Sequence, residues 1–257
     1  MNIGKLITIS AAVLSLTTAQ ANAESVKVGI GTESYPPFAV PNAKGEYSGW
    51  EIDITNAICD QAKLDCEIVA TAWDGIIPSL VAGKIDVIAA SLSITEERAK
   101  VIDFSDKYYQ SGANLAVATG SDIVPTAESL SGKKIGVQSG SIHQSYALKH
   151  FKTAQIKEYQ TQDEANQDLF SGRIDATLAD AIVLDEFLQT PEGGVCCSSA
   201  GLVASDEDIL GKGIGFALRK GNDELRGKLN VAIEEIRANG TYDKITQGYF
   251  NFNIYGE

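Results

Sequence analysis

Hydroxyl side chains and one arginine are crowded into the stretch AASLSITEERAKVIDFSDKYY, which covers residues 89–109. An arginine guanidinium can bind a carboxylate through two parallel hydrogen bonds, and free N–H groups at the start of a helix favour the same anion. Ser93 followed three residues later by Glu96 fits a capping box, so we expect a helix from about Ile94, with Arg98 one turn further on. The stretch therefore predicts a site for a carboxylate group.

A second set of polar residues complements this carboxylate site. Residues 139–141 have the sequence SGS and offer hydroxyl and amide groups at a second predicted helix start, and Asp180 ends a predicted strand. A free amino acid carries a carboxylate and an ammonium on one carbon, so Arg98 and Asp180 together predict amino-acid binding. Each residue also has an ordinary structural alternative: Ser91 and Ser93 as helix caps, Arg98 as a partner of the adjacent glutamates, and Asp180 as the cap of the helix that follows.

The elements that must position these residues form two similar series. SLVAGKIDVIAAS at residues 79–91 and DLFSGRIDATLAD at 168–180 each contain a helix end, a glycine, a basic residue, Ile-Asp and an apolar strand with a polar end. This alternation predicts an α/β fold of two lobes, each with a mixed, mostly parallel sheet flanked by helices. Ligands of such sheets bind beyond the carboxyl ends of the strands, so we expect a cleft between the lobes. The polar segments at those ends are Thr32–Tyr35, Ser91–Ser93, Ser139–Ser141 and Asp180.

Sequence periodicity also predicts where elements and lobes begin and end. We expect Gly83 and Gly172 to end two helices. The chain should pass between the lobes twice, at 108–117 and 211–218, where small residues suit a two-segment hinge. The predicted lobes are residues 24–110 with 214–257, and residues 111–213. The expected strands are 26–31, 66–70, 85–91, 133–140, 155–160 and 174–180, and the expected helices are 50–64, 73–84, 141–151, 161–173 and 181–189.

The N-terminus carries the pattern of a secretory signal peptide. Lys5 precedes an apolar run from Leu6 to about Thr18, and the small-x-small sequence Ala21-Asn22-Ala23 predicts cleavage after Ala23, which makes residues 1–23 the signal peptide. The apolar run is shorter than the roughly 20 residues that span a bilayer. We therefore expect an exported, periplasmic protein.

Charge and cysteine content narrow the partners and the compartment. The chain has 257 residues and a net charge of −13, which repels phosphate backbones and makes nucleic acid an unsuitable partner. In an oxidising compartment, the spacing of Cys59 and Cys66 suggests a disulfide between a helix end and the next strand. The adjacent Cys196 and Cys197 allow a vicinal disulfide, two free thiols or an intermolecular bridge. With two histidines and no C-x-x-C spacing, we expect no metal site.

The whole mature chain resembles the periplasmic polar and basic amino-acid-binding proteins that feed ABC importers, the lysine/arginine/ornithine- and histidine-binding group. The resemblance implies the two-lobed periplasmic-binding-protein fold of type II, a monomer without cofactor or catalytic activity, and delivery of the ligand to the importer's membrane subunits. It is carried by the motifs SYPPF, GWEIDITNAIC, WDGIIPSL, SLSITEER, IDFSDKYY, GVQSG, GRIDATLAD, GKGIGFALRK and ANGTYDKI.

The resemblance also implies roles for individual residues. Arg98 matches the arginine that binds the ligand carboxylate, with help from Ser93 and from Ser141 of the other lobe. Asp180 matches the aspartate that binds the ammonium, and the Ser91 region lies alongside. Two aromatic residues, Tyr35 and Trp73, match the pair that encloses the ligand side chain, although Trp73 also suits core packing. Cys59 and Cys66 match a disulfide of the histidine/lysine branch.

Several positions near the expected ligand side chain depart from the family pattern. Basic-ligand members usually have an acidic residue three places before the tyrosine, where this chain has Thr32, and Glu33 lies one place nearer. Ala90 stands where serine is common. His143 stands where glutamine is common, and either bonds the distal end of the ligand or faces solvent. The ligand side chain is therefore the open part of the prediction.

The predicted function is to bind a basic amino acid, namely arginine, lysine, ornithine or histidine, for an ABC importer. Two alternatives share the fold. One is an opine-binding protein of the octopine or nopaline type, and the other is an exported enzyme similar to cyclohexadienyl dehydratase. Ser139, His143 and Asp180 could be imagined as a catalytic triad, but no G-x-S-x-G sequence supports one.

Overall fold

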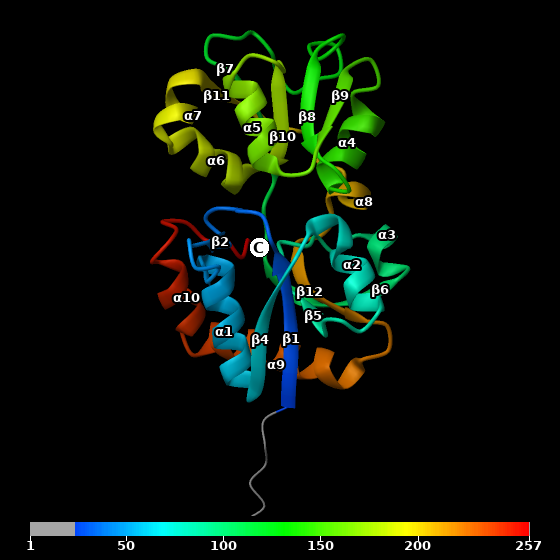
Figure 1. Ribbon diagram of the computed structural model, residues 1–257, viewed down its shortest axis with the longest axis vertical. Helices are drawn as coiled ribbons and strands as arrows, with labels where there is room; N and C mark the ends of the chain where they lie inside the picture. Colours follow the sequence, from blue (N-terminus) through cyan, green and yellow to red (C-terminus); the bar gives the residue numbers. More distant parts are fainter. Residues whose placement is uncertain (1–23, 257) are drawn as a thin grey trace, which may run out of the picture.

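Two five-stranded sheets, each in its own lobe, form the framework of the computed structural model, which describes residues 24–256. The first lobe lies below the second in Figure 1, and helices cover both sheets. Strands of the first sheet, in spatial order, are β4 (Leu64–Thr71), β1 (Glu24–Gly31), β5 (Val87–Ile88), β12 (Ile214–Arg219) and β6 (Ile102–Tyr109). Those of the second are β11 (Cys197–Leu202), β7 (Ala113–Ala118), β10 (Ala176–Asp180), β8 (Lys134–Gln138) and β9 (Gln155–Tyr159).

The two sheets have the same pattern of strand directions. In the first, β1 is parallel to β4 and β5, while β12 is antiparallel to both of its neighbours. In the second, β8 is parallel to β9 and β10, while β7 is antiparallel to both of its neighbours. Each sheet therefore has one reversed strand among otherwise parallel ones. This confirms the predicted fold of two mixed, mostly parallel sheets.

Helices join the strands of each lobe. The prediction that Gly83 and Gly172 end two helices is confirmed, since both have positive φ, 71° and 67°, directly after α2 and α5. Their N–H groups donate to Leu80 and Leu169 in the same way, at 3.0 Å, which closes the last turn of each helix. The helices are α1 (Trp50–Ala62), α2 (Trp73–Val81), α3 (Glu96–Ala99), α4 (Ile142–His150), α5 (Gln162–Phe170), α6 (Ala181–Gln189), α7 (Pro191–Cys196), α8 (Glu207–Leu210), α9 (Asp223–Ala238) and α10 (Thr241–Thr246); a short hairpin joins β2 (Val40–Pro41) to β3 (Tyr47–Ser48).

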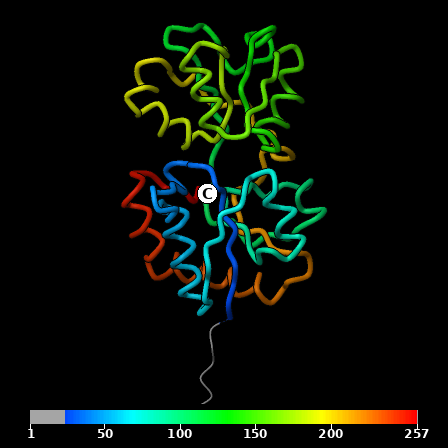
Figure 2. The backbone as a smooth tube through the Cα atoms, viewed as in Figure 1, coloured from blue at the N-terminus to red at the C-terminus, as the bar shows by residue number. Residues whose placement is uncertain are grey.

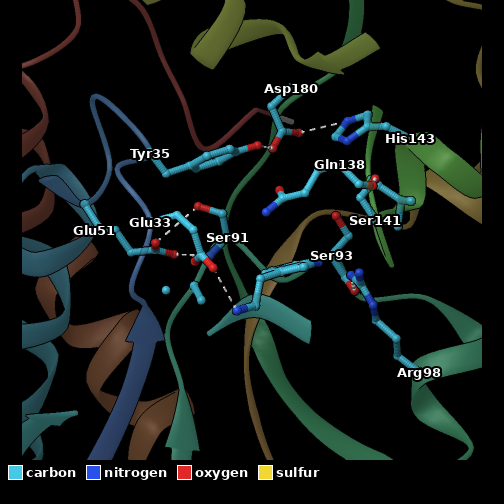
Figure 3. Close-up of a pocket in the computed structure, with 15 residues that line it drawn as sticks. Glu33, Tyr35, Glu51, Ser91, Ser93, Arg98, Gln138, Ser141, His143 and Asp180 are labelled. Carbon is cyan, nitrogen blue, oxygen red and sulfur yellow. Dashed lines mark hydrogen bonds and ion pairs between the residues drawn. The ribbon is translucent and has the colours of Figure 1, made fainter. Parts of the chain in front are cut away.

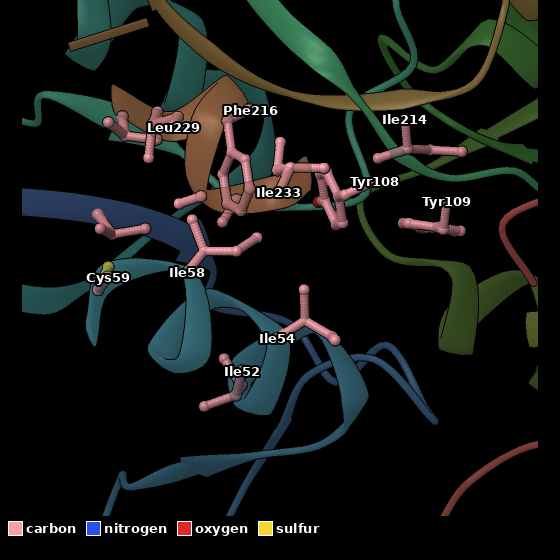
Figure 4. Close-up of a cluster of buried hydrophobic side chains, with 14 of the residues drawn as sticks. Ile52, Ile54, Ile58, Cys59, Tyr108, Tyr109, Ile214, Phe216, Leu229 and Ile233 are labelled. Atoms are coloured by element: carbon pink, nitrogen blue, oxygen red, sulfur yellow. The ribbon is translucent and has the colours of Figure 1, made fainter. Parts of the chain in front are cut away.

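The core of the first lobe lies between its sheet and the helices α1 and α9 (Figure 4). Ile54 and Ile58 lie on one face of α1, and both are fully buried, as the helical spacing predicts. Leu229 and Ile233 of α9 belong to the same buried cluster. Because α1 and α9 pack on the strands that end at the interlobe side, this core holds those strand ends in place.

Two connections link the lobes within the described part of the chain (Figure 2). Residues 110–112 join β6 to β7, and residues 203–213 return through α8 to β12. Gly211 and Gly213 of the return segment have positive φ and lie against neighbouring chain: a Cβ on Gly211 would be 2.6 Å from the Ile94 carbonyl oxygen. The first connection lies inside the predicted segment 108–117. The second begins earlier than predicted, at residue 203, and overlaps the predicted segment 211–218 only at residues 211–213.

Both cysteine pairs form disulfides. Cys59 at the end of α1 is bonded to Cys66 in β4, as predicted. Cys196 is bonded to Cys197 at the junction of α7 and β11, which is the vicinal disulfide among the three alternatives. The predicted signal peptide lies outside the described residues. Among residues 24–256, no helix has the length and apolar character needed to span a membrane.

Candidate ligand-binding site

A cavity of about 600 Å³ lies between the two lobes, where the carboxyl ends of parallel strands point. Figure 3 shows its labelled side chains converging from both lobes. The first lobe contributes Gly31, Glu33, Tyr35, Ala39, Glu51, Trp73, Ala90, Ser91, Ser93 and Arg98, and the second contributes Gln138, Ser141, Ile142, His143 and Asp180.

All the predicted site residues except Thr32 and Ser139 line this cavity. Thr32 is exposed, and its carbonyl accepts a hydrogen bond from the Tyr47 hydroxyl at 3.1 Å, outside the lining. Ser139 instead contributes its backbone carbonyl, which accepts from Nε1 of Trp73 at 3.1 Å. The lining therefore contains Glu33, and not Thr32, at the position that departs from the family pattern.

The helix that carries Arg98 begins later than the predicted capping box implies. Thr95 is the N-cap, since its Oγ1 accepts from the Arg98 N–H at 3.3 Å, and α3 starts at Glu96. Ser93 instead pairs with Ile214 in an antiparallel bridge, which keeps the backbone extended at this point. The prediction of a cap at Ser93 is therefore wrong, because Ser93 pairs with the start of the distant strand β12 and does not begin a helix.

Arg98 is held by its own loop and by an aromatic ring. Its Nη1 donates to the Ser93 carbonyl at 3.1 Å, and the guanidinium lies 5.6 Å from the centre of the Trp73 ring. Burial lowers the pKa of Arg98 to about 10, which leaves the group charged at neutral pH. With five N–H donors in a planar fork, a guanidinium in this setting can bind a carboxylate in the cavity.

Asp180 presents its carboxylate to the cavity from the second lobe. It stands at the N-cap position of α6 but makes no side-chain capping bond, so the predicted alternative of a helix cap is wrong. Oδ2 accepts a hydrogen bond from the Tyr35 hydroxyl at 2.5 Å, and Oδ1 lies 3.6 Å from Nε2 of His143 (Figure 3). Burial and the nearby Asp180 raise the pKa of Tyr35 well above its ordinary value, so the hydroxyl stays a donor.

Tyr35 and Trp73 connect the two lobes across the cavity. Tyr35 of the first lobe donates to Asp180, and Trp73 of the first lobe donates to Ser139 of the second. The backbone N–H of Trp73 also donates to Oε1 of Glu33 at 3.2 Å. One side of Trp73 packs on the apolar cluster around Ile76, so this ring has both the cavity role and part of the core role considered above.

Glu51 is the main lining residue that the sequence analysis missed. It is 1% exposed and accepts hydrogen bonds from the Ser91 N–H at 2.7 Å, from the Ser91 hydroxyl at 3.1 Å and from the Tyr108 hydroxyl. Burial raises the pKa of Glu51, and the bonds from Tyr108 and Ser91 oppose that rise. Its signal was present: Glu51 lies three and seven positions before Ile54 and Ile58, on the buried face of α1.

Four further lining residues were not predicted, and they show where strand ends open into the cavity. Gln138 is the last residue of β8, and Ile142 is the first of α4. Gly31 ends β1, and Ala39 forms a bridge with Tyr35. Within residues 24–256, no group of three or more His, Cys, Asp or Glu side chains converges as metal ligands do. The site is thus a cavity with separated charged groups for an organic ligand.

Comparisons with known proteins agree with this geometry. Residues 26–252 match the model of the bacterial extracellular solute-binding proteins, family 3. The histidine-binding periplasmic protein of Salmonella typhimurium is 43% identical over 246 residues, which cover 94% of each chain. The lysine/arginine/ornithine-binding periplasmic protein of Escherichia coli is 42% identical over 237 residues, covering 91% of this chain and 90% of that protein.

A solved structure has the same fold. An ancestral arginine-binding protein bound to arginine superposes with a TM-score of 0.80 at 38% identity, covering 90% of this chain and all of that one. Together with two similar lobes and a cavity at their strand ends, the matches establish that this chain belongs to the bacterial extracellular solute-binding proteins, family 3.

Proposed function

We propose that this protein captures a basic amino acid (arginine, lysine, ornithine or histidine) between its lobes in the periplasm and delivers it to the membrane subunits of an ABC importer. The observation that carries the proposal is the pair of opposite charges on opposite walls of one cavity, with Arg98 from the first lobe and Asp180 from the second. A carboxylate bound to Arg98 and an ammonium bound to Asp180 are the two charged groups of a free amino acid.

The charges that remain in the cavity favour a cationic ligand side chain. Three carboxylates line it, on Glu33, Glu51 and Asp180, against the guanidinium of Arg98. Glu51 accepts bonds from Ser91 and Tyr108 through both of its oxygens, whereas Glu33 accepts from the Trp73 N–H through Oε1. We assign Glu33 to the cationic end of the ligand, whose aliphatic part would lie between Tyr35 and Trp73.

Ligand binding would stabilise closure of the two lobes. Tyr35 to Asp180 and Trp73 to Ser139 are bonds that exist only when the lobes meet. A ligand held by Arg98 on one side and Asp180 on the other adds its binding energy to the closed state alone and shifts the population toward it. In this proposal, residues 24–110 with 214–257 move as one lobe against residues 111–213, and cleavage after Ala23 releases the mature chain.

The proposal is tested by thermal shift on refolded, ligand-free protein with the common amino acids, octopine and nopaline. A ligand that binds only the folded state raises stability by about 2.7 kcal/mol at one hundred times its Kd. We expect large shifts with basic amino acids, loss of these shifts in Arg98→Gln, and unchanged shifts in Arg226→Gln, whose guanidinium pairs with Asp223 on α9. A shift with opines alone would replace the ligand class, and conversion of a ligand to a product would overturn the binding role.

A further inference from the structure

His143 is a buried histidine without a hydrogen bond at one ring nitrogen. It lies in the first turn of α4 and is 5% exposed, so the alternative that it faces solvent is wrong. Its Nε2 forms no hydrogen bond within residues 24–256 and points into the cavity toward Asp180, 3.6 Å from Oδ1 (Figure 3). A buried nitrogen in this position costs free energy until a partner reaches it.

We propose that His143 is a specificity-determining residue whose protonation opposes the binding of cationic ligands at Asp180, so that ligand capture releases a proton. The inference rests on the proposed function, because it needs the ligand ammonium to lie at Asp180. Histidine is the side chain whose charge ordinarily changes between pH 5 and 8. A protonated His143 would pair with Asp180 and occupy the carboxylate that the ammonium needs.

The charged groups around His143 determine how readily its ring is protonated. Asp180 of β10 is the ionisable group within 4 Å of Nε2, and Tyr35 reaches His143 through the same carboxylate. On α4 itself, Lys149 and His150 bond to Asp206 instead, which precedes α8. The other charged cavity residues are Arg98, Glu33 and Glu51, and the other charged residues of the elements packed on α4 are the exposed Lys134, Lys157, Glu158, Glu207 and Asp208.

The sign of the effect follows from linkage. A cation next to Asp180 repels a second positive charge on His143, so the ligand binds better when His143 is neutral. By reciprocity, binding expels the proton, and affinity falls as the pH falls.

The same geometry separates two ligand classes. A ligand with an additional carboxylate near Nε2 would be attracted by a protonated His143, so its affinity would rise as the pH falls and binding would take up a proton. Arginine has no such group and keeps its charges over this range. The direction of proton exchange therefore distinguishes a basic amino acid from an opine at this site.

The test is titration calorimetry with arginine at pH 5.5, 6.5 and 7.5, each in two buffers of different ionisation enthalpy. We expect wild type to bind arginine more weakly at pH 5.5 than at pH 7.5, and to release protons on binding. His143→Gln should bind arginine with little dependence on pH and no buffer-dependent heat. His150→Gln is the matched control, since it replaces the other histidine of α4, which pairs with Asp206 at 2.6 Å, and it should behave as wild type.

Each outcome bears on one statement. Equal pH dependence of arginine binding in wild type and His143→Gln would overturn the role of His143. The proposed function would still stand if wild type binds arginine at pH 7.5. No arginine binding by folded wild type at pH 7.5 would overturn the proposed function itself. Proton uptake on arginine binding, instead of release, would overturn the proposed opposition between a charged His143 and the ligand ammonium. Circular dichroism and unfolding temperature of each unliganded variant verify that it is folded.

Discussion

Replacement of Glu51 tests how strongly the buried hydrogen bonds at the cavity wall stabilise the fold. Replacing it by alanine removes the acceptor for three donors: the Ser91 N–H, the Ser91 hydroxyl and the Tyr108 hydroxyl. At about 1–1.5 kcal/mol each, these three bonds contribute roughly 3–4.5 kcal/mol. Burial of the carboxylate, which raises the pKa of Glu51, offsets part of this. We therefore expect Glu51→Ala to lower the free energy of unfolding by about 2–3 kcal/mol.

Glu51→Gln is the matched variant, because its amide retains the shape and offers one acceptor oxygen and an NH2 group with two donor hydrogens. The oxygen can accept from the Ser91 N–H and from Tyr108, while the amide nitrogen donates to the Ser91 hydroxyl, which can rotate. We expect a loss below about 1 kcal/mol. The assay is urea unfolding of ligand-free protein at pH 7. If alanine left the midpoint unchanged, or if glutamine cost as much as alanine, the assigned bonds would not support the fold as argued.

The stability difference between wild type and Glu51→Gln should change with pH in a definite direction. Burial raises the folded pKa of Glu51 above its ordinary value of 4.5, so protonation of Glu51 favours the folded state. This protonation-dependent part of the stability is complete below pH 4.5 and is lost as the pH rises through the folded value. Glu51→Gln does not titrate at this position. Its stability relative to wild type should therefore improve as the pH rises above about 4.5. A constant difference from pH 4 to 7 would contradict the raised pKa.

Three further changes test the site, the cross-link and the return segment. Asp180→Asn should weaken arginine binding by about 2–5 kcal/mol in calorimetry, because an amide cannot neutralise the ammonium; unchanged affinity would remove Asp180 from the site. Joint replacement of Cys59 and Cys66 by serine should lower the free energy of unfolding by about 2.5 kcal/mol in urea, as expected for a short loop. Gly211→Ala should lower the melting temperature, because its Cβ would lie 2.6 Å from the Ile94 carbonyl oxygen, and a wild-type melting curve would refute that contact.

The repeated pattern of the sequence was sufficient to predict the fold. Helix, glycine, Ile-Asp and apolar strand recur as local signals, and the structure has the same turn at Gly83 and at Gly172. Most cavity residues could also be predicted, because parallel strands bring their carboxyl ends together whatever the details of packing. The limits of each lobe and the binding roles of individual side chains stay predictions.

Features that depend on distant parts of the chain were not predictable from local patterns. The helix cap is Thr95 and not the predicted Ser93, because Ser93 pairs with Ile214, more than a hundred residues later. The burial of Glu51 could have been read from its helical spacing to Ile54 and Ile58, but its partners could not, since only the fold places Ser91 and Tyr108 against it. His143 likewise lies beside Asp180 only because the fold brings α4 against β10.

The position of β12 has a consequence for the order in which the protein matures. The second sheet is built from one uninterrupted segment, between Ala113 and Leu202, so a chain that emerges from its N-terminus can complete that sheet early. The first sheet waits for β12, which enters between β5 and β6. Ile214, the first residue of β12, also forms the bridge that sets Ser93 and hence the loop of Arg98. In the proposed function, the ability of Arg98 to bind a ligand carboxylate is thus acquired late, only after nearly the whole chain is available to fold.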